Sequence, residues 1–466
     1  MELIYYLKSS ICIVLVLVLC YKYLQNNQSI VQLLFTAFAL KYFSIAIIGP
    51  TIDVLYLFSL FVAFLELVSF LSRRAKVSKN MLLLFSLPFI LFIQFLVVYN
   101  FQNNHYLASL NPVFWYIKTG ASYIKSFLPY FLVGMAIKRQ VNNIEFENIF
   151  KVVLKIATVS CAIAFIQLFA FIVFHQNGTL LELIGLNGGY NYQYNILGIS
   201  LVRVQAFFYE PKSLAAFLGL AVPVALHLKK KRRALLFVLV GFLTLSQTFI
   251  VILLAAFIVF VLLKSVQSIR ASILSSLAII IALFLSISSL KDYLLENYAT
   301  NEETIAYKIF LDRALNRYSL DDLDENRELF GIPLQPDIEL PAVNFLRDNN
   351  VFILTGFGPG NYNTIPFKYF ISDWNIAALE KGTFKGHFDM GWIYLIAEFG
   401  LLFFLFVFSI LTSIQPSGFG TKFYSFLWLV FFFHRIDVLL IASFCLLFYK
   451  TRTRENFDSN YILQPG

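Results

Sequence analysis

Charged residues are scarce in this chain of 466 residues. They make up 14% of it, whereas soluble domains carry about a quarter. Apolar residues make up 59%, and long apolar runs recur from residue 9 to residue 449. This composition excludes an ordinary soluble domain. It predicts an all-α polytopic membrane protein, because spanning segments must satisfy their own backbone hydrogen bonds in lipid.

Signatures of common catalytic and metal sites are also absent. The five histidines show no metal-ligand spacing, and there is no serine-nucleophile elbow, phosphate loop or H-E-x-x-H. The four cysteines lie in or at the ends of apolar runs, which indicates packing rather than disulfides. No cleavable targeting segment is expected, because only Lys8 precedes the first apolar run and no small-residue cleavage site follows it. We expect neither a metal nor another cofactor.

The apolar runs predict about 12 transmembrane helices, 12 or 13 in all. The expected spans are 9–24, 29–48, 52–71, 81–100, 113–137, 150–174, 211–228, 234–246, 248–264, 271–290, 387–413, 422–434 and 436–449. Two full spans need about 40 residues, more than the stretch 234–263 offers. We expect a short hairpin there, because Ser246-Gln247-Thr248 interrupts the run and basic residues flank both ends. A single long span would reverse the sidedness of everything that follows.

Basic short loops set the expected orientation. Lysine and arginine cluster at 73–79, 138–155 and 229–233, which predicts that these loops are cytoplasmic. Residues 291–386 then form one large extracytoplasmic loop with 15 acidic and 9 basic residues, while the rest has 12 and 27. The basic excess indicates contact with anionic membrane lipid, not nucleic acid. The predicted domains are 1–290 with transmembrane helices 1–10, the loop 291–386, and 387–466 with the C-terminal helices and a short cytoplasmic tail.

The most informative stretch runs from Arg203 to Leu220 and centres on Glu210-Pro211. Placing ionisable groups beside a membrane span costs free energy, so their presence there usually indicates a functional site. Proline suits the first helical turn, and Glu210 would lie at the cap, where the positive helix end favours an anion. If this stretch were helical, Arg203 and Glu210 would share a face, and with Lys212 nearby they could bind a phosphate. The alternative is an interfacial ion pair that only caps a helix, worth under about 1 kcal/mol.

Two further patterns precede the last spans. Gly356, Gly358 and Gly360 could bring backbone close to a ligand, although a tight turn is the alternative and no βαβ frame supports a dinucleotide site. His387 is expected to open an inward-running helix. Histidine can take a proton from a hydroxyl near neutral pH, and an interfacial hydrogen bond is the alternative. Glu398 lies on nearly the same helical face and could equally be a polar clamp between helices.

Several basic residues are candidates for anion binding. Lys118 and Lys125 lie seven residues apart in one predicted span, so they share a helical face. Two lysines within a span are expected to face an anion or a water-filled cavity. The alternative, that a lysine side chain snorkels to the membrane surface, could explain one of them. In the outer loop, Arg313, Arg317 and Arg327 could reach an anionic substrate. Their alternative is to be solvated or paired with neighbouring acidic residues.

In this order and sidedness, the features resemble the O-antigen ligase/polymerase family of bacterial surface-polysaccharide assembly. The matching parts are Arg203 to Leu220, Leu243 to Ser246, the large outer loop, Gly356 to Tyr362 and His387 to Leu402. The first 200 residues match only in span pattern and in Thr51-Ile52-Asp53 leading a helix. Members often carry arginine after the serine at 246, where this chain has Gln247, so the chain departs from the family at one anion contact.

The resemblance implies a GT-C-like, metal-independent glycosyltransferase of the bacterial inner (plasma) membrane. Its donor would be an oligosaccharide on a polyprenyl diphosphate, used at the outer leaflet. By resemblance, Arg203 holds the diphosphate, His387 matches the family's histidine after the loop, and one or more of Arg313, Arg317 and Arg327 match a loop arginine. Cations and helix N-termini would stabilise the leaving group, and Glu210 or His387 would be the base.

Three functions stay open at this point. A polymerase would extend lipid-linked repeat units into O-antigen, capsule or exopolysaccharide, and the run Phe207 to Pro211 favours it slightly. A ligase would move the glycan to another acceptor. The rival is a transporter such as a lipid-linked oligosaccharide flippase, although such folds are usually built from repeats and none is visible. Expected partners are the polyprenyl-diphosphate-linked oligosaccharide, membrane lipid, and a chain-length regulator and flippase of the same pathway, with no nucleic acid.

Overall fold

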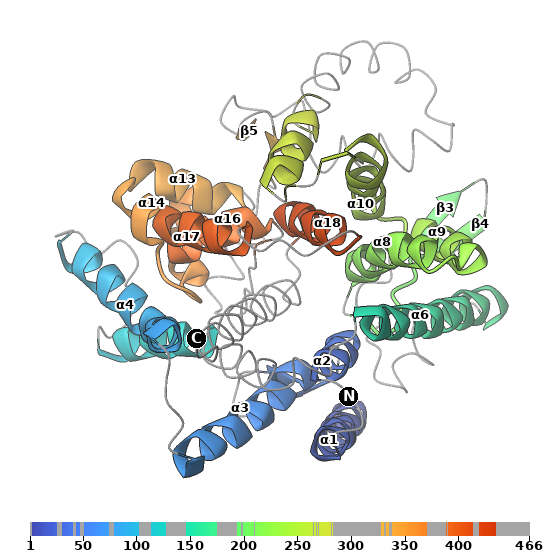
Figure 1. Cartoon of the computed structure of the whole chain (residues 1–466), viewed down its shortest axis with the longest axis horizontal. Coiled ribbons are helices and arrows are strands. Elements are labelled where there is room, and N and C mark those ends of the chain that lie inside the picture. Colours follow the sequence, from blue (N-terminus) through green and yellow to red (C-terminus); the bar gives the residue numbers. More distant parts are fainter. Residues whose placement is uncertain are drawn as a thin grey trace, which may run out of the picture. The chain divides into compact units, whose positions relative to one another are not determined.

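The computed structural model is mostly helical (Figure 1). It describes residues 2–25, 30–40, 43–46, 51–73, 79–101, 113–126, 146–174, 193–196, 199–208, 210–263, 265–266, 268, 270–280, 282, 328–329, 332–334, 338–370, 388, 390–412 and 419–434.

The described helices follow the apolar runs of the sequence, except for two short ones that lie in the predicted outer loop 291–386. They are α1 (Glu2–Leu24), α2 (Ile30–Ala39), α3 (Val54–Arg73), α4 (Lys79–Phe101), α6 (Phe146–Phe174), α8 (Pro211–His227), α9 (Lys231–Leu243), α10 (Gln247–Phe257), α13 (Leu340–Asp348), α14 (Val351–Thr355), α16 (Gly391–Phe399), α17 (Leu401–Thr412) and α18 (Phe419–Phe433). Residues 113–126 and 270–280 are helical as well. The π-helical turn η3 (Ile258–Leu262) continues α10, and the short 3-10 turns η7 (Tyr362–Thr364) and η8 (Phe367–Tyr369) follow α14.

Among the described residues, three two-stranded antiparallel hairpins qualify the all-α prediction. They pair β1 (Ser44–Ala46) with β2 (Thr51–Asp53), β3 (Gln193–Ile196) with β4 (Ile199–Val202), and β5 (Glu328–Leu329) with β6 (Ile332–Pro333). The span expected at 29–48 therefore ends early, at Ala39. Its C-terminal part forms β1, and the helix breakers Gly49-Pro50 lie between the two strands in the sequence.

The chain divides into two compact units. One comprises Met1–Lys76, Pro129–Leu262 and Asp437–Gly466, and the other comprises Val77–Leu128 and Leu263–Ile436. In the first unit, α1, α2 and α3 enclose a core that includes the fully buried side chains Cys12, Leu33 and Phe58, and α6 packs against α2, α8 and α9. In the second, α14 packs against α4, α16 and α17. The domain boundaries predicted at 290 and 386 concern the side of the membrane on which each segment lies, whereas the division into two units reflects packing.

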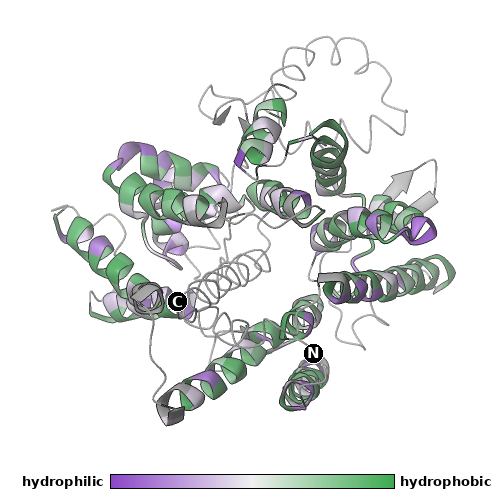
Figure 2. Cartoon of the chain, in the orientation of Figure 1, coloured by the Kyte–Doolittle hydropathy of each residue, from purple (hydrophilic) through white to green (hydrophobic). Residues whose placement is uncertain are grey.

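Two helical segments among the described residues, Tyr6–Leu24 and Asn148–Val173, are long and apolar enough to cross a membrane. Other described helices contain shorter apolar stretches of 10–17 residues. A stretch of 17 residues, such as Pro211–His227, rises about 26 Å, whereas a hydrocarbon core is about 30 Å thick. Figure 2 shows hydrophobic residues over most of the helices. On the outer face of α6, Ile166 and Phe169 are each 62% exposed. These features are compatible with a membrane protein, without establishing twelve spans.

Two expected local features are confirmed. The apolar run is broken between α9, which ends at Leu243, and α10, which begins at Gln247. Phe249 of α10 then packs back on Phe242 of α9, with ring centroids 5.4 Å apart. At the start of α3, Asp53 accepts a hydrogen bond from the Tyr56 amide at 2.8 Å, as a residue that caps a helix should.

The span expected at 387–413 is not one helix. It is divided at Gly400, whose φ of 91° ends α16 and lets α17 start in a new direction. A side chain at Gly400 would meet the Leu354 carbonyl oxygen at 2.2 Å, so close packing against α14 also requires glycine. The apolar run alone does not predict this break.

Candidate functional site

Arg203 begins a non-helical segment buried inside the first unit. Its side chain is 9% exposed, and its Nε donates a hydrogen bond to the Thr244 carbonyl at 2.9 Å. The next amide, that of Val204, reaches the Leu243 carbonyl at 3.5 Å. Two of the sequence stretches that carry the family resemblance, Arg203 to Leu220 and Leu243 to Ser246, are thus in direct contact. Thr244 follows the C-terminal end of α9, where carbonyl oxygens favour a cation.

Residues 203–208 do not extend α8 backwards, so Arg203 and Glu210 are not one face of a helix. Ala206 has a φ of 49°, in the left-handed region that few residues other than glycine adopt. Glu210 is extended, with φ −140° and ψ 153°, as expected for a residue that precedes proline. The proline therefore both starts α8 and stops the helix from growing toward Arg203.

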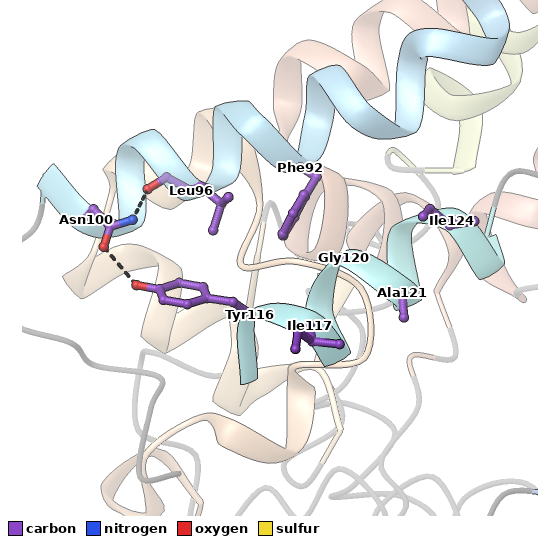
Figure 3. A pocket seen from close by; sticks show the side chains of 8 residues that line it. All are labelled: Phe92, Leu96, Asn100, Tyr116, Ile117, Gly120, Ala121 and Ile124. Carbon is purple, nitrogen blue, oxygen red and sulfur yellow. Dashed lines mark hydrogen bonds between the residues drawn. The ribbon is translucent and has the colours of Figure 1, made fainter. Parts of the chain in front are cut away.

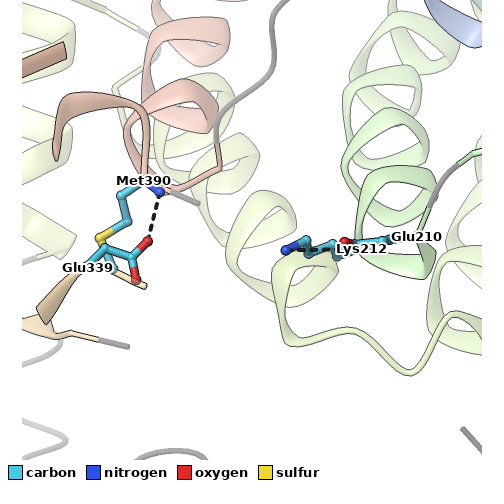
Figure 4. A network of polar contacts seen from close by, with 4 residues as sticks. All are labelled: Glu210, Lys212, Glu339 and Met390. Atoms are coloured by element: carbon cyan, nitrogen blue, oxygen red, sulfur yellow. Dashed lines mark hydrogen bonds and ion pairs between the residues drawn. The ribbon is translucent and has the colours of Figure 1, made fainter. Parts of the chain in front are cut away.

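Glu210 is the N-cap of α8, with Pro211 at the first helical position. Its carboxylate makes no side-chain capping bond and instead pairs with Lys212 Nζ at 3.0 Å (Figure 4). The side chains of Glu210 and Lys212 are 15% and 17% exposed, so the pair is mostly shielded from solvent. The expected position of Glu210 is confirmed. The positive charge of Lys212 is balanced by its neighbour.

The segment 203–210 adjoins the beginnings of two helices. It leads directly into α8, and Arg203 is bonded to the turn that precedes α10. The N-cap of α10, Ser246, makes no side-chain capping bond either. Close helix packing holds this arrangement, because a side chain at Gly219 of α8 would meet Ile252 of α10 at 2.5 Å. A helix start supplies N–H groups for an anion, and an arginine adds a fixed positive charge.

Sequence reasoning missed a central member of this site, Gln167 on α6. Its side chain is 3% exposed and bonds the backbone of the segment three times. Oε1 accepts from the amides of Gln205 at 3.1 Å and Ala206 at 2.9 Å, and Nε2 donates to the Ala206 carbonyl at 3.3 Å. The available signal was a lone amide in a long apolar helix, which is less conspicuous than a charge.

The glycine-rich run lies in the second unit and is a tight turn packed on the end of α16. Gly356, Gly358 and Gly360 have φ values of 70°, 84° and 79°. The amides of Phe357 and Gly358 donate to the carbonyls of Ala397 and Glu398 at 2.8 and 3.1 Å. The sequence patterns Gly356 to Tyr362 and His387 to Leu402 are therefore joined by backbone hydrogen bonds, and this geometry favours the tight-turn interpretation.

The buried side chain of Asn361 stabilises the same turn through hydrogen bonds. It is 1% exposed, accepts a hydrogen bond from Thr119 Oγ1 at 3.2 Å, and donates to the Phe357 carbonyl at 2.9 Å. Glu398 is buried near this backbone contact, beside Tyr123. The interpretation of Glu398 as a polar group between helices agrees with this position.

A second buried carboxylate, Glu339, was not singled out in the sequence. It is fully buried at the N-cap of α13, and its Oε1 accepts a hydrogen bond from the Met390 amide at 3.3 Å (Figure 4). Met390 is the N-cap of α16, so one side chain joins the beginnings of two helices. The sequence signal was again an acid and a proline at a helix start, Glu339 and Pro341.

The far end of α13 is held by a tyrosine. Tyr369 donates a hydrogen bond to Asp348 Oδ2 at 2.9 Å. Burial, followed by this hydrogen bond, raises the pKa of Tyr369 above its ordinary value. The phenol therefore keeps its proton, and with it the bond, to a higher pH than a solvated tyrosine would.

A groove of about 590 Å³ lies between α4 and helix 113–126 (Figure 3). Its lining residues are Phe92, Leu96, Asn100, Tyr116, Ile117, Gly120, Ala121 and Ile124. At one end, Tyr116 donates to Asn100 Oδ1 at 2.8 Å. Lys118 and Lys125 are exposed on the same helix but do not line the groove. Its surface suits a hydrocarbon chain better than the anion expected beside these lysines.

Comparison with known proteins does not identify a relative of this chain. The chain matches no protein-family model, no curated protein and no solved structure. The resemblance to the O-antigen ligase/polymerase family therefore stays a prediction made from the sequence.

Several predicted site residues lie outside the described part of the chain. These are the loop arginines Arg313, Arg317 and Arg327, and His387. The residue that follows His387 is placed: Phe388 is buried against Tyr362, with ring centroids 5.1 Å apart. Within the described residues, no group of three histidine, cysteine, aspartate or glutamate side chains could hold a metal ion.

Proposed function

We propose that the chain is a multi-pass membrane glycosyltransferase of the bacterial inner membrane. It would polymerise oligosaccharide repeat units carried on a polyprenyl diphosphate into a surface polysaccharide at the outer leaflet. The observation that carries the proposal is the bond from Arg203 to Thr244. It joins two of the stretches that together resemble the family, beside the beginnings of two helices, where an anionic leaving group could be held.

In the proposed reaction, an acceptor hydroxyl attacks the anomeric carbon of the donor sugar. The new glycosidic C–O bond forms as the bond from that carbon to the diphosphate breaks, and the lipid diphosphate leaves with the electron pair. Arg203, the positive end of the α8 dipole and the N–H groups at the start of α10 would stabilise its developing charge. Glu210, or His387 as the alternative base, would take the hydroxyl proton.

Purified protein in lipid nanodiscs provides the direct test. Incubation with lipid-linked repeat units should convert them into a ladder of longer products, resolved by gel electrophoresis or mass spectrometry. The same mixture without protein is the control. Transfer of an unlengthened glycan to a second acceptor would favour a ligase, and movement of the donor across the bilayer without a new glycosidic bond would favour a flippase.

The proposed sidedness is tested by thiol labelling in a background whose four native cysteines are replaced. Asn350 and Arg232 are both exposed and lie in stretches predicted to face opposite sides of the membrane. We expect Asn350→Cys to react with a membrane-impermeant maleimide in spheroplasts, and Arg232→Cys to react only after permeabilisation. Equal labelling of both positions in sealed spheroplasts would contradict the topology.

A further inference from the structure

The strongest unassigned feature of the first unit is the side chain of Gln167. It lies in a 29-residue apolar helix whose outer face carries the exposed residues Ile166 and Phe169. An amide buried in such a setting is costly unless its donors and acceptor find partners. Gln167 directs both ends of its amide to one place, the backbone at residues 205–206.

That backbone needs a partner because it belongs neither to a helix nor to a strand. β4 ends at Val202 and α8 begins at Pro211. Within the segment, Phe208 bonds back to the Gln205 carbonyl and Val204 reaches Leu243. The amides of Gln205 and Ala206 and the carbonyl of Ala206 are met by Gln167. Non-helical backbone at membrane depth is tolerated only where protein or a water-filled cavity satisfies it.

The bonds also hold a strained conformation. Ala206 has a φ of 49°, which an alanine adopts only where its surroundings impose it. The same turn sets where Arg203 lies relative to Thr244 and to the start of α8. If the segment relaxed, Arg203 would move away from the turn that precedes α10.

We infer that Gln167 is a positioning residue, which holds residues 203–208 in the conformation that keeps Arg203 beside the helix starts. It acts through the backbone and is not assigned a contact with substrate. The role rests on the proposed function, because it matters to the reaction only if Arg203 binds the lipid diphosphate. The clamp itself does not rest on that function and can be measured separately.

Two substitutions at Gln167 test which of its hydrogen bonds hold the segment. Gln167→Leu keeps much of the volume and removes all three bonds. Gln167→Glu keeps an acceptor for the two amides, so it should rescue most of what leucine loses. Thr158→Val is the matched control, because Thr158 lies on the same helix and its hydroxyl donates to the Leu154 carbonyl of that helix at 2.7 Å.

The first readout is hydrogen exchange of peptides covering residues 203–208, in nanodiscs and without substrate. We expect Gln167→Leu to lower protection at least about tenfold, because two buried amides lose their acceptor. Gln167→Glu should lie between leucine and wild type, and Thr158→Val should match wild type. Unchanged protection in Gln167→Leu would overturn the clamp.

The second readout is the dissociation constant for undecaprenyl diphosphate, the probe for the proposed donor, in the same nanodiscs. We expect a rise of at least about tenfold for Gln167→Leu, with substantial rescue by Gln167→Glu. If leucine loosens the segment but binding is unchanged, the positioning role is wrong while the proposed function stands. If wild-type protein neither binds the probe nor lengthens glycans, the proposed function fails, and the positioning role fails with it.

Discussion

Replacing Arg203 with alanine is expected to slow glycan lengthening at least about 100-fold, since loss of one fixed group that stabilises a developing negative charge typically costs that much. Arg203→Lys should recover part of the rate, because lysine keeps the positive charge but lacks the planar guanidinium that can bind phosphate in a bidentate manner. The measurement is the initial rate of lengthening in nanodiscs at saturating lipid-linked donor.

The structure supplies both a control for this experiment and a competing explanation. Arg270 is an exposed arginine whose Nη2 donates to the Ser409 carbonyl at 3.1 Å, so Arg270→Ala removes a comparable arginine–carbonyl bond far along the sequence. We expect its lengthening rate to match wild type. The competing explanation is that Arg203 only stabilises the end of α9 through Thr244. In that case Arg203→Ala would lower the thermal midpoint and leave the rate of the folded fraction unchanged.

The predictability of the site from sequence differs sharply between its parts. Glu210 at the start of α8 could be predicted, because an acid followed by proline is a local signal that depends on few other residues. The backbone between Arg203 and Glu210 could not, because the amides of Gln205 and Ala206 are hydrogen-bonded to Gln167, which lies outside this segment on α6. The helix-period spacing of Arg203 and Glu210 was therefore misleading, and nothing local revealed the left-handed Ala206.

The fold shows the same contrast between local and distant causes. Apolar runs predicted the helices well, and Ser246 to Thr248 predicted the break before α10. They did not predict the division between α16 and α17 at Gly400, because that break depends on the approach of Leu354 from α14. They also could not show Glu339 joining the starts of α13 and α16, since Glu339 and Met390 lie 51 residues apart.

Replacing Gly356 with alanine is expected to prevent the second unit from folding stably. Its φ of 70° and ψ of 169° lie in a region that is essentially restricted to glycine, and this conformation alone would cost an alanine about 1–3 kcal/mol. In addition, a Cβ would lie 2.4 Å from the Glu398 carbonyl carbon and 2.5 Å from the Phe399 nitrogen. These are backbone atoms of α16 that cannot rotate away, and overpacking of this kind typically adds about 1–3 kcal/mol or more. The measurement is the thermal midpoint of monodispersity in detergent, with the yield of folded protein as a second readout.

Gly360→Ala is the matched control, because it separates backbone conformation from packing. Gly360 also has a positive φ, 79°, but it is exposed and its nearest neighbour is the hydroxyl of Ser122 at 3.2 Å. We expect a loss of about 1–2 kcal/mol, from backbone strain alone. Equal stability of the two variants would contradict the packing explanation.

If Gly360→Ala stays stable yet no longer binds the lipid-linked donor, the glycine run contacts a ligand, and the tight-turn interpretation is incomplete. Retention of both stability and binding by Gly360→Ala, with folding lost in Gly356→Ala, would assign the run to the architecture that holds α16 in place.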